Sequence, residues 1–123
     1  MTDTNGGGAS EPRLIEIESL RQSPTAALFE GARFGGVPVS SFIISHMPGG
    51  GPRLHVHPYP EVFVLLQGEA TFRVGDRVVP ARGGHIVVAP GGVPHRFTNT
   101  GTEALSLVSI QPSDHVIQEN LAE

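Results

Sequence analysis

Short β-rich runs separated by glycine and proline limit what this chain can fold into. Its 123 residues include 16 glycines and 11 prolines. Glycine supplies the positive φ of tight turns, and proline interrupts helices and central strands. We therefore expect many short strands and little helix, with 23–30 and 116–122 as the only candidates for helix. The expected strands are 14–17, 37–45, 61–66, 71–74, 77–79, 86–88, 95–98 and 104–110.

Two of these segments carry more detailed predictions. Residues 71–79 read TFRV-GD-RVV, which predicts a hairpin with a type II′ turn that has Gly75 first. Residues 61–66, EVFVLL, form a continuous apolar run, as expected for a strand buried on both faces. Short strands at regular spacing indicate an all-β barrel or sandwich.

Length and charge exclude several classes of protein. A chain of this length fits one domain, which we place at 13–123 after a polar, glycine-rich leader, 1–12, expected to be disordered. The formal net charge is −4 and no basic patch is visible, so we expect no nucleic-acid partner. No apolar run is long enough to span a bilayer, and we expect no membrane partner. The lack of cysteine excludes thiolate metal sites and fits a reducing cytoplasm, which is the expected location.

Three histidines and one glutamate form the most informative pattern. His55 and His57 are two residues apart, so in a strand their side chains point the same way. Glu61 follows after two prolines have forced a bend, and His95 opens its own short strand after a Pro-Gly-Gly turn. Three imidazoles and one carboxylate suit a divalent Fe, Mn, Ni, Co, Cu or Zn ion.

At these positions the chain resembles the cupin superfamily. The positions that match the first cupin motif are Gly49, His55, His57, Glu61 and Gly68. Those that match the second motif are Gly84, Pro90, Gly92, His95 and Asn99. The connection between the motifs, 69–83, is short, as in small single-domain bacterial cupins.

The resemblance implies an all-β fold, the double-stranded β-helix (jelly-roll) cupin barrel, over the domain 13–123. It also implies one metal ion per chain inside the barrel, bound by His55, His57, Glu61 and His95. Members of the superfamily frequently dimerise through an exchanged or edge strand, so we expect a homodimer.

Two further residues are candidates for catalysis or substrate contact. In an extended strand Arg53 would point inward with His55, where it could clamp a substrate carboxylate. The alternative is a solvent-facing arginine beside a glycine-rich turn. Tyr59, between two prolines, could cap the cavity or pack at the rim of the barrel.

The remaining aromatic and polar residues are assigned by parity and spacing. Phe63 and Phe97 share parity with Glu61 and His95, which predicts that they line the pocket. Asn99 is interpreted as a turn residue. Three other histidines lack ligand spacing and are interpreted as surface or hydrogen-bonded residues: His46, His85 and His115.

The ligand set limits which metal ions would suit an enzyme. Four protein ligands leave a six-coordinate ion two adjacent free positions, whereas they would saturate a tetrahedral zinc ion. An enzyme would therefore favour Fe(II), which we prefer, or Mn, Ni or Co over Zn. The substrate should be a small molecule, because a barrel of this size encloses little room.

Two classes of function follow from this site. The first is a metalloenzyme with non-haem, dioxygenase-like chemistry, or alternatively a lyase or isomerase that uses the ion as a Lewis acid. The second is a non-catalytic module that binds a small molecule or the metal itself. No second domain is evident to transmit a signal, which favours an enzyme. No general acid or base is evident beyond the ligands, which favours oxygen chemistry.

Overall fold

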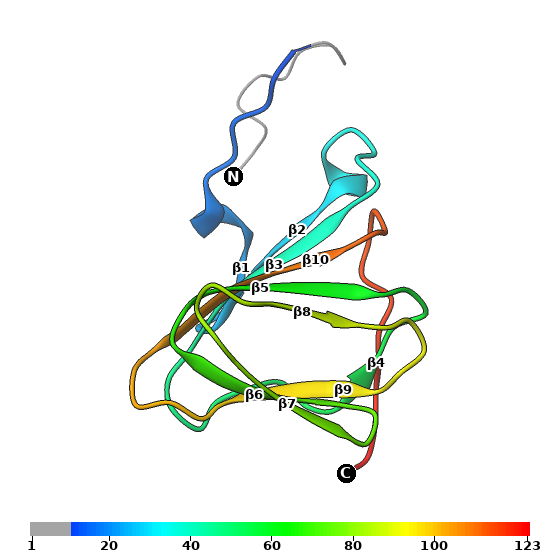
Figure 1. The fold of residues 1–123 in the computed structure, drawn as a ribbon. Helices are drawn as coiled ribbons and strands as arrows, with labels where there is room; N and C mark the ends of the chain where they lie inside the picture. Colours follow the sequence, from blue (N-terminus) through cyan, green and yellow to red (C-terminus); the bar gives the residue numbers. More distant parts are fainter. Residues whose placement is uncertain (1–10) are drawn as a thin grey trace.

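The computed structural model describes residues 11–123 as two antiparallel β-sheets that face each other (Figure 1). In spatial order the six-stranded sheet comprises β1 (Arg21–Ser23), β2 (Ala26–Glu30), β3 (Ser40–His46), β10 (Leu105–Gln111), β5 (Glu61–Gln67) and β8 (Ile86–Ala89). The five-stranded sheet comprises β11 (Glu119–Asn120), β4 (His55–Val56), β9 (His95–Asn99), β6 (Glu69–Val74) and β7 (Arg77–Arg82). The predicted all-β jelly-roll fold is confirmed. Residues 1–10 of the expected leader lie outside the described residues.

Several predicted strands are confirmed, and the hairpin is the most detailed of them. β6 pairs with β7 so that Val74 lies opposite Arg77. Gly75 between them has φ 62°, and no non-glycine residue among those described has positive φ. A positive φ at the first turn residue alone is the pattern of a type II′ turn, because a type I′ turn needs it at both.

Three predictions on secondary structure are wrong. Residues 14–17 form no strand, and the chain instead makes a 3₁₀ turn, η1 (Ile17–Leu20). The predicted helix 23–30 is largely β2, which pairs with β3, and 116–122 contains β11, which pairs with β4. Pairing with a neighbouring strand satisfies the backbone groups there, so tertiary contacts override weak local helix preference. A second 3₁₀ turn, η2 (Gly31–Arg33), follows β2, and no helix of the described chain is long and apolar enough to cross a membrane.

The predicted strand 37–45 begins later than expected, at Ser40. Pro38 has no amide hydrogen to donate to a ladder, so the segment before Ser40 cannot pair regularly. The strand then pairs with both β2 and β10.

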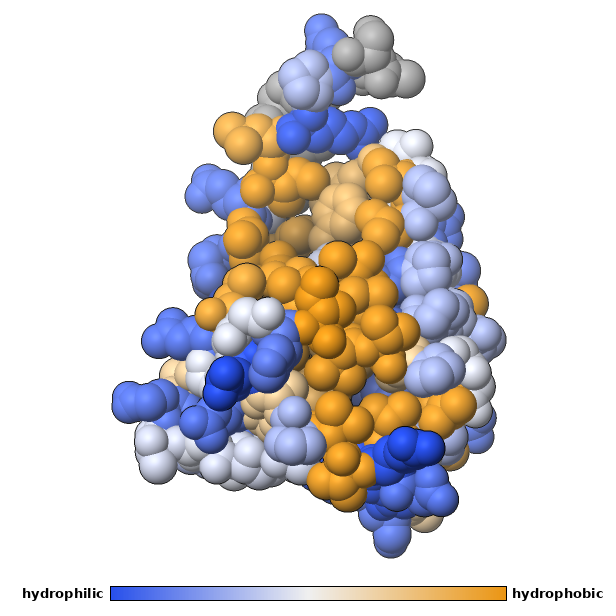
Figure 2. Space-filling model, in the orientation of Figure 1, coloured by the Kyte–Doolittle hydropathy of each residue, from blue (hydrophilic) through white to orange (hydrophobic). Residues whose placement is uncertain are grey.

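β5 is buried on one face only, which corrects the prediction of burial on both. Glu61, Phe63 and Leu65 point into the barrel and are buried, whereas Leu66 on the opposite face is 60% exposed. The outward residues of β5 continue across β8 and β10 as apolar rows without a charged side chain, and these rows reach β3 at Ser41 and Ile43. We call these residues the outer apolar face: Ile43, Val62, Val64, Leu66, Ile86, Val88, Val108 and Ile110. Figure 2 shows apolar side chains gathered across the region that β5 and β8 occupy in Figure 1.

The main core lies between the two sheets. Its centre is a cluster of three phenylalanine rings, Phe63, Phe72 and Phe97, whose centroids are 5.0–5.9 Å apart. Aliphatic residues of β5 and β10, among them Leu65 and Leu107, pack against these rings. This apolar cluster fills part of the interior and leaves the remainder to polar side chains.

Candidate metal centre

Three strands and one loop bring the four predicted ligands together. His55 is in β4 and lies directly opposite His95, the first residue of β9. Glu61 is the first residue of β5, and His57 lies in the loop between β4 and β5. All four side chains are buried.

Two glycines of the surrounding sequence make this arrangement possible. A Cβ atom on Gly51 would lie 2.0 Å from the Phe97 carbonyl oxygen, so only glycine lets the segment before β4 approach β9. Gly92 has φ 76°, a conformation that other residues rarely adopt, and its amide donates to the His57 carbonyl over 2.8 Å. The turn before His95 is thereby held next to the loop that carries His57.

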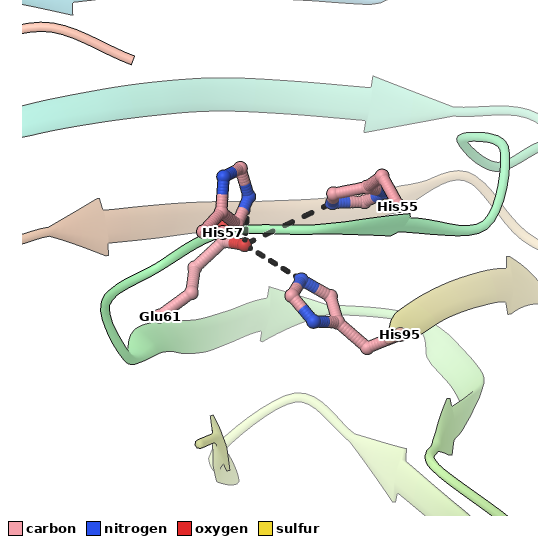
Figure 3. Close-up of side chains that lie close together, drawn as sticks. All are labelled: His55, His57, Glu61 and His95. Carbon is pink, nitrogen blue, oxygen red and sulfur yellow. Dashed lines mark hydrogen bonds and ion pairs between the residues drawn. The ribbon is translucent and has the colours of Figure 1, made fainter. Parts of the chain in front are cut away.

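The ligand atoms converge on one point (Figure 3). Glu61 Oε1 lies 2.9 Å from His95 Nε2, 3.0 Å from His57 Nε2 and 3.9 Å from His55 Nε2. The ligand atoms of the four residues all lie within 4.8 Å of one another. This is the spacing expected of groups that surround a single ion.

The opposite nitrogen of each ring is held by a backbone carbonyl. His55 Nδ1 lies 2.7 Å from the Arg53 oxygen, His57 Nδ1 2.7 Å from the Ile117 oxygen, and His95 Nδ1 3.1 Å from the Val93 oxygen. A carbonyl only accepts hydrogen bonds, so each Nδ1 carries a proton, and a ring that is neutral then turns an Nε2 lone pair inward.

This donor set fits a metal cation. Lone pairs of three neutral rings face a carboxylate oxygen, which is repulsive unless the rings gain protons or a cation lies among them. The buried Nε2 of His57 has no well-aligned hydrogen-bond partner. Imidazole and carboxylate donors without thiolate suit a divalent transition metal ion.

The electrostatics of the site favour an ionised glutamate. Burial by itself would raise the pKa of Glu61, but its interactions with the facing rings of His55, His57 and His95 outweigh burial and hold this pKa well below its usual range. Burial likewise acts to lower the pKa of His57, yet its bonds to Glu61 and to the Ile117 carbonyl leave that pKa raised. The cluster therefore provides one negative charge at its centre.

Gln111, which no sequence motif identified, supports Glu61 through the carboxylate oxygen that does not face the histidines. Its amide donates to Glu61 Oε2 over 3.1 Å, which leaves Oε1 to face the histidines. Gln111 is fully buried on the inward face of β10, in line with Leu105 and Leu107. A polar residue at the end of an apolar inward series was the sequence signal that could have revealed it.

Tyr59 completes this support rather than capping the cavity. Its hydroxyl donates to Gln111 Oε1 and accepts a hydrogen bond of 3.0 Å from the Ile117 amide. Its ring stacks on His57, with centroids 5.2 Å apart and planes 9° apart. Burial raises the pKa of Tyr59, so the phenol keeps the proton that it donates.

Arg53 does not join the cluster. Its side chain is exposed, and it does not line the adjoining cavity. The parity argument assumed an extended strand, but β4 begins only at His55. Only the Arg53 carbonyl contributes, as the partner of His55 Nδ1.

A cavity of about 280 Å³ adjoins His55 and Glu61. Phe63 and Phe97 line it, as predicted. Its full lining is Thr25, Ala26, Phe42, Ile44, His46, Gly51, Pro52, His55, Glu61, Phe63, Phe97 and Gln118. The metal cluster therefore borders a space in which a small molecule fits.

His46 is a cavity residue, which corrects its interpretation as an ordinary histidine. It is the last residue of β3 and lies opposite Leu105, so its side chain shares the inward face. Its ring packs edge-on against Phe97 at 5.8 Å, and burial lowers its pKa, which keeps it neutral at pH 7. In the sequence, His46 has the same parity along the strand as Phe42 and Ile44, and this spacing could have shown that it points inward.

The other polar predictions away from the cluster are confirmed. His85 accepts a hydrogen bond from the Arg82 amide, and exposed His115 pairs with Asp114. Asn99 donates to the carbonyls of His46 and Glu103 and accepts from the Gly101 amide. It is the buried last residue of β9, its side chain holds the turn that follows, and it does not contact the four ligands.

The fold and the site define a jelly-roll barrel protein with a candidate metal centre inside. Residues 42–111 match the family model described as Cupin domain, and the chain belongs to the cupin family. A curated relative, an uncharacterized protein from Streptomyces coelicolor, is 26% identical over 102 residues, which cover 83% of this chain and 95% of the relative.

Solved structures share the fold at low sequence identity. A double-stranded β-helix protein from Klebsiella pneumoniae has a TM-score of 0.71 at 21% identity, covering 92% of this chain and all of that protein. An oxalate decarboxylase from Bacillus subtilis with Mn(II) centres has a TM-score of 0.80 at 20% identity and 98% coverage of this chain. This chain spans only 35% of the length of that decarboxylase. An oxalate oxidase in complex with glycolate has a TM-score of 0.68 at 22% identity, covering 80% of this chain and 57% of the oxidase.

Proposed function

We propose that this cupin is a metalloenzyme that binds one divalent transition metal ion and acts on a small organic substrate. The ligands of the ion are His55, His57, Glu61 and His95. One observation carries the proposal: three Nε2 lone pairs and one carboxylate oxygen converge in a buried cluster that borders a cavity.

The protein contributes orientation and a largely apolar lining. Backbone carbonyls orient the three rings, and Gln111 orients Glu61. When bound, the ion would supply Lewis-acid and redox chemistry at this site. Phe63 and Phe97 present apolar surface to the space beside these ligands.

We prefer oxygenase-type chemistry with Fe(II). Glu61 is the only carboxylate among the described residues that line the cavity, and it is a ligand of the proposed ion. Three neutral imidazoles and one carboxylate leave a divalent ion with a net positive charge, which favours binding of a small anionic or enol-type chelator.

A lyase or isomerase is the second candidate, and His46 favours it. A neutral imidazole in the cavity is able to accept a proton from a bound substrate. The likeness to an oxalate decarboxylase with Mn(II) centres is consistent with this candidate but rests on the fold alone.

Turnover under controlled metal and atmosphere separates the candidates. The Fe(II) protein is incubated with small β-diketones, thiols and hydroxy acids while O₂ consumption and product are measured. Substrate-dependent O₂ consumption supports the oxygenase. Anaerobic turnover with Mn(II) that is lost in His46→Gln, but not in His85→Gln, supports the lyase or isomerase. Tight binding without turnover under any condition supports a non-catalytic binding module.

We also propose that the protein pairs as a homodimer through the outer apolar face. Ile86 and Val88 on the edge strand β8 are 64% and 57% exposed, and their rows continue inward over β5 and β10. Burial of such rows against a second copy would remove apolar area from water without burying a charge. Light scattering should give twice the 13.0 kDa of one chain. Val88→Glu should lower the mass to that of one chain, whereas Ile17→Glu, outside this face, should not.

A further inference from the structure

The side chains that line the cavity include no cation. All eight cationic side chains of the sequence are arginines, and none of them lines this space. Apart from the proposed ligands His55 and Glu61, the only ionisable side chain among the described residues of the lining is His46, whose pKa is lowered by burial so that it is neutral at pH 7. The cavity therefore offers no positive charge of its own to a ligand.

Most of the lining is apolar. Phe42, Ile44 and Phe63 extend from the inward faces of β3 and β5, and Phe97 closes the side toward β9. The polar groups that remain outside the metal cluster are Thr25, His46 and Gln118. An apolar group in this space would gain contacts and lose its exposure to water.

A charged group in the same space would be disfavoured. A carboxylate buried there, beyond the group that chelates the ion, would lose its hydration without gaining a cationic side chain as a partner, and the carboxylate of Glu61 borders the same space. The volume, about 280 Å³, lies near the lower limit of ligand pockets and holds one small molecule.

We propose that the cavity selects a chelating ligand whose non-chelating part is uncharged and apolar, and that it discriminates against small dicarboxylates. This inference rests on the proposed metal centre, because the chelating part of the ligand needs the ion. It takes the place of the anion clamp that was one of the two alternatives for Arg53, whose side chain is exposed.

The test uses hydroxamates that share one chelating group and differ in the tail. The full chain is loaded with Co(II) and titrated with acetohydroxamate, 4-methylpentanohydroxamate and the monohydroxamate of succinic acid, while the visible spectrum of Co(II) is followed. The last two ligands are matched in shape, because a carboxylate replaces the branched methyl pair. We expect the methylated tail to bind about tenfold more tightly than acetohydroxamate, since it buries several more carbons. The carboxylate tail should bind more weakly than acetohydroxamate.

Reciprocal variants sharpen the test. Thr25→Arg and Gln118→Arg each place a cation at the cavity, and either should shift the preference at least about tenfold toward the carboxylate tail. Thr102→Arg adds the same charge at an exposed turn residue outside the lining and should leave the preference unchanged. Equal or tighter binding of the carboxylate tail by the unaltered protein, or no binding of any hydroxamate, would overturn the inference. Uptake of Co(II) is measured separately, so failure of the metal centre itself would be seen as absent Co(II) binding.

Discussion

The two ends of the barrel interior are built on the same strands but are stabilised in different ways. On β5 the inward residues run from Glu61 to Leu65, and on β10 they run from Gln111 to Leu107. One end is therefore an apolar core that includes the phenylalanine cluster, and the other is a buried polar cluster. At the apolar end contact area alone stabilises the fold, whereas at the metal end each buried polar atom needs a partner.

This difference indicates which residues stabilise the fold and which support the site. Most polar atoms at the metal end have partners, but among the described residues His57 Nε2 and Ser109 Oγ are buried without a well-aligned one. The apolar end should therefore determine stability without metal, and the metal end should add stability only when an ion is bound.

The largest expected effect on stability is at the apolar end. Leu107→Ala removes a fully buried side chain of the core and should lower the free energy of unfolding by about 3 kcal/mol. Urea denaturation measures the loss. Metal content of the folded fraction should stay near one ion per chain. Val78→Ala, at a 70% exposed position of β7 outside the outer apolar face, is the control and should cost far less. Similar losses in the two variants would contradict the assignment of the core.

Metal binding should have the next largest effect. A divalent ion at about 100 times its dissociation constant should raise the free energy of unfolding by about 2.7 kcal/mol. His57→Ala should abolish this increase and sharply reduce the metal content measured by elemental analysis, because it removes one of four ligands. His85→Ala, at an exposed position, should change neither quantity. Full metal content in His57→Ala would show that His57 is not a ligand.

A smaller effect is expected at the residue that supports Glu61. Gln111→Leu keeps the approximate volume but removes a hydrogen bond to a carboxylate, which should cost about 2 kcal/mol of metal-bound stability. Metal affinity should fall with it, because Glu61 Oε2 loses its donor. Gln67→Leu, at the exposed end of β5, is the matched control. An unchanged metal affinity in Gln111→Leu would mean that Glu61 is oriented without Gln111.

The smallest effect is expected at Ser109, and its sign is opposite. Its hydroxyl is buried without a partner, so Ser109→Ala should raise the free energy of unfolding by up to about 1 kcal/mol. Ser41→Ala instead removes a hydrogen bond of 2.7 Å to the Ser109 carbonyl and should lower it slightly. Thermal denaturation of both variants makes the comparison. A loss of stability in Ser109→Ala would show that the hydroxyl has a partner in solution.

Much of this fold and site could be predicted because the relevant signals are local. Turn glycines and β-rich runs determine where the strands lie, as the 71–79 hairpin and the run 61–66 show. The pattern of His55, His57, Glu61 and His95 identified a group that the structure brings within 4.8 Å. Spacing of two residues along a strand and the framing glycines already specify the directions of these side chains.

Other features were decided only by the tertiary structure. Residues 26–30 and 119–120 are strands because β3 and β4 lie beside them, and local preference did not show this. Tyr59 and Gln111 are 52 residues apart in sequence and meet only because the barrel brings β10 behind the loop that carries Tyr59.

Arg53 and His46 show the same limit at the cavity. Parity predicts direction only inside a strand: Arg53 lies just before β4 and is exposed, whereas His46 ends β3 and faces inward. The sequence by itself thus determined the class of fold and the four candidate ligands, because both depend on the spacing of residues within short segments. The shape, charge and supporting contacts of the cavity depend on where distant strands meet, and only the packed barrel specifies that.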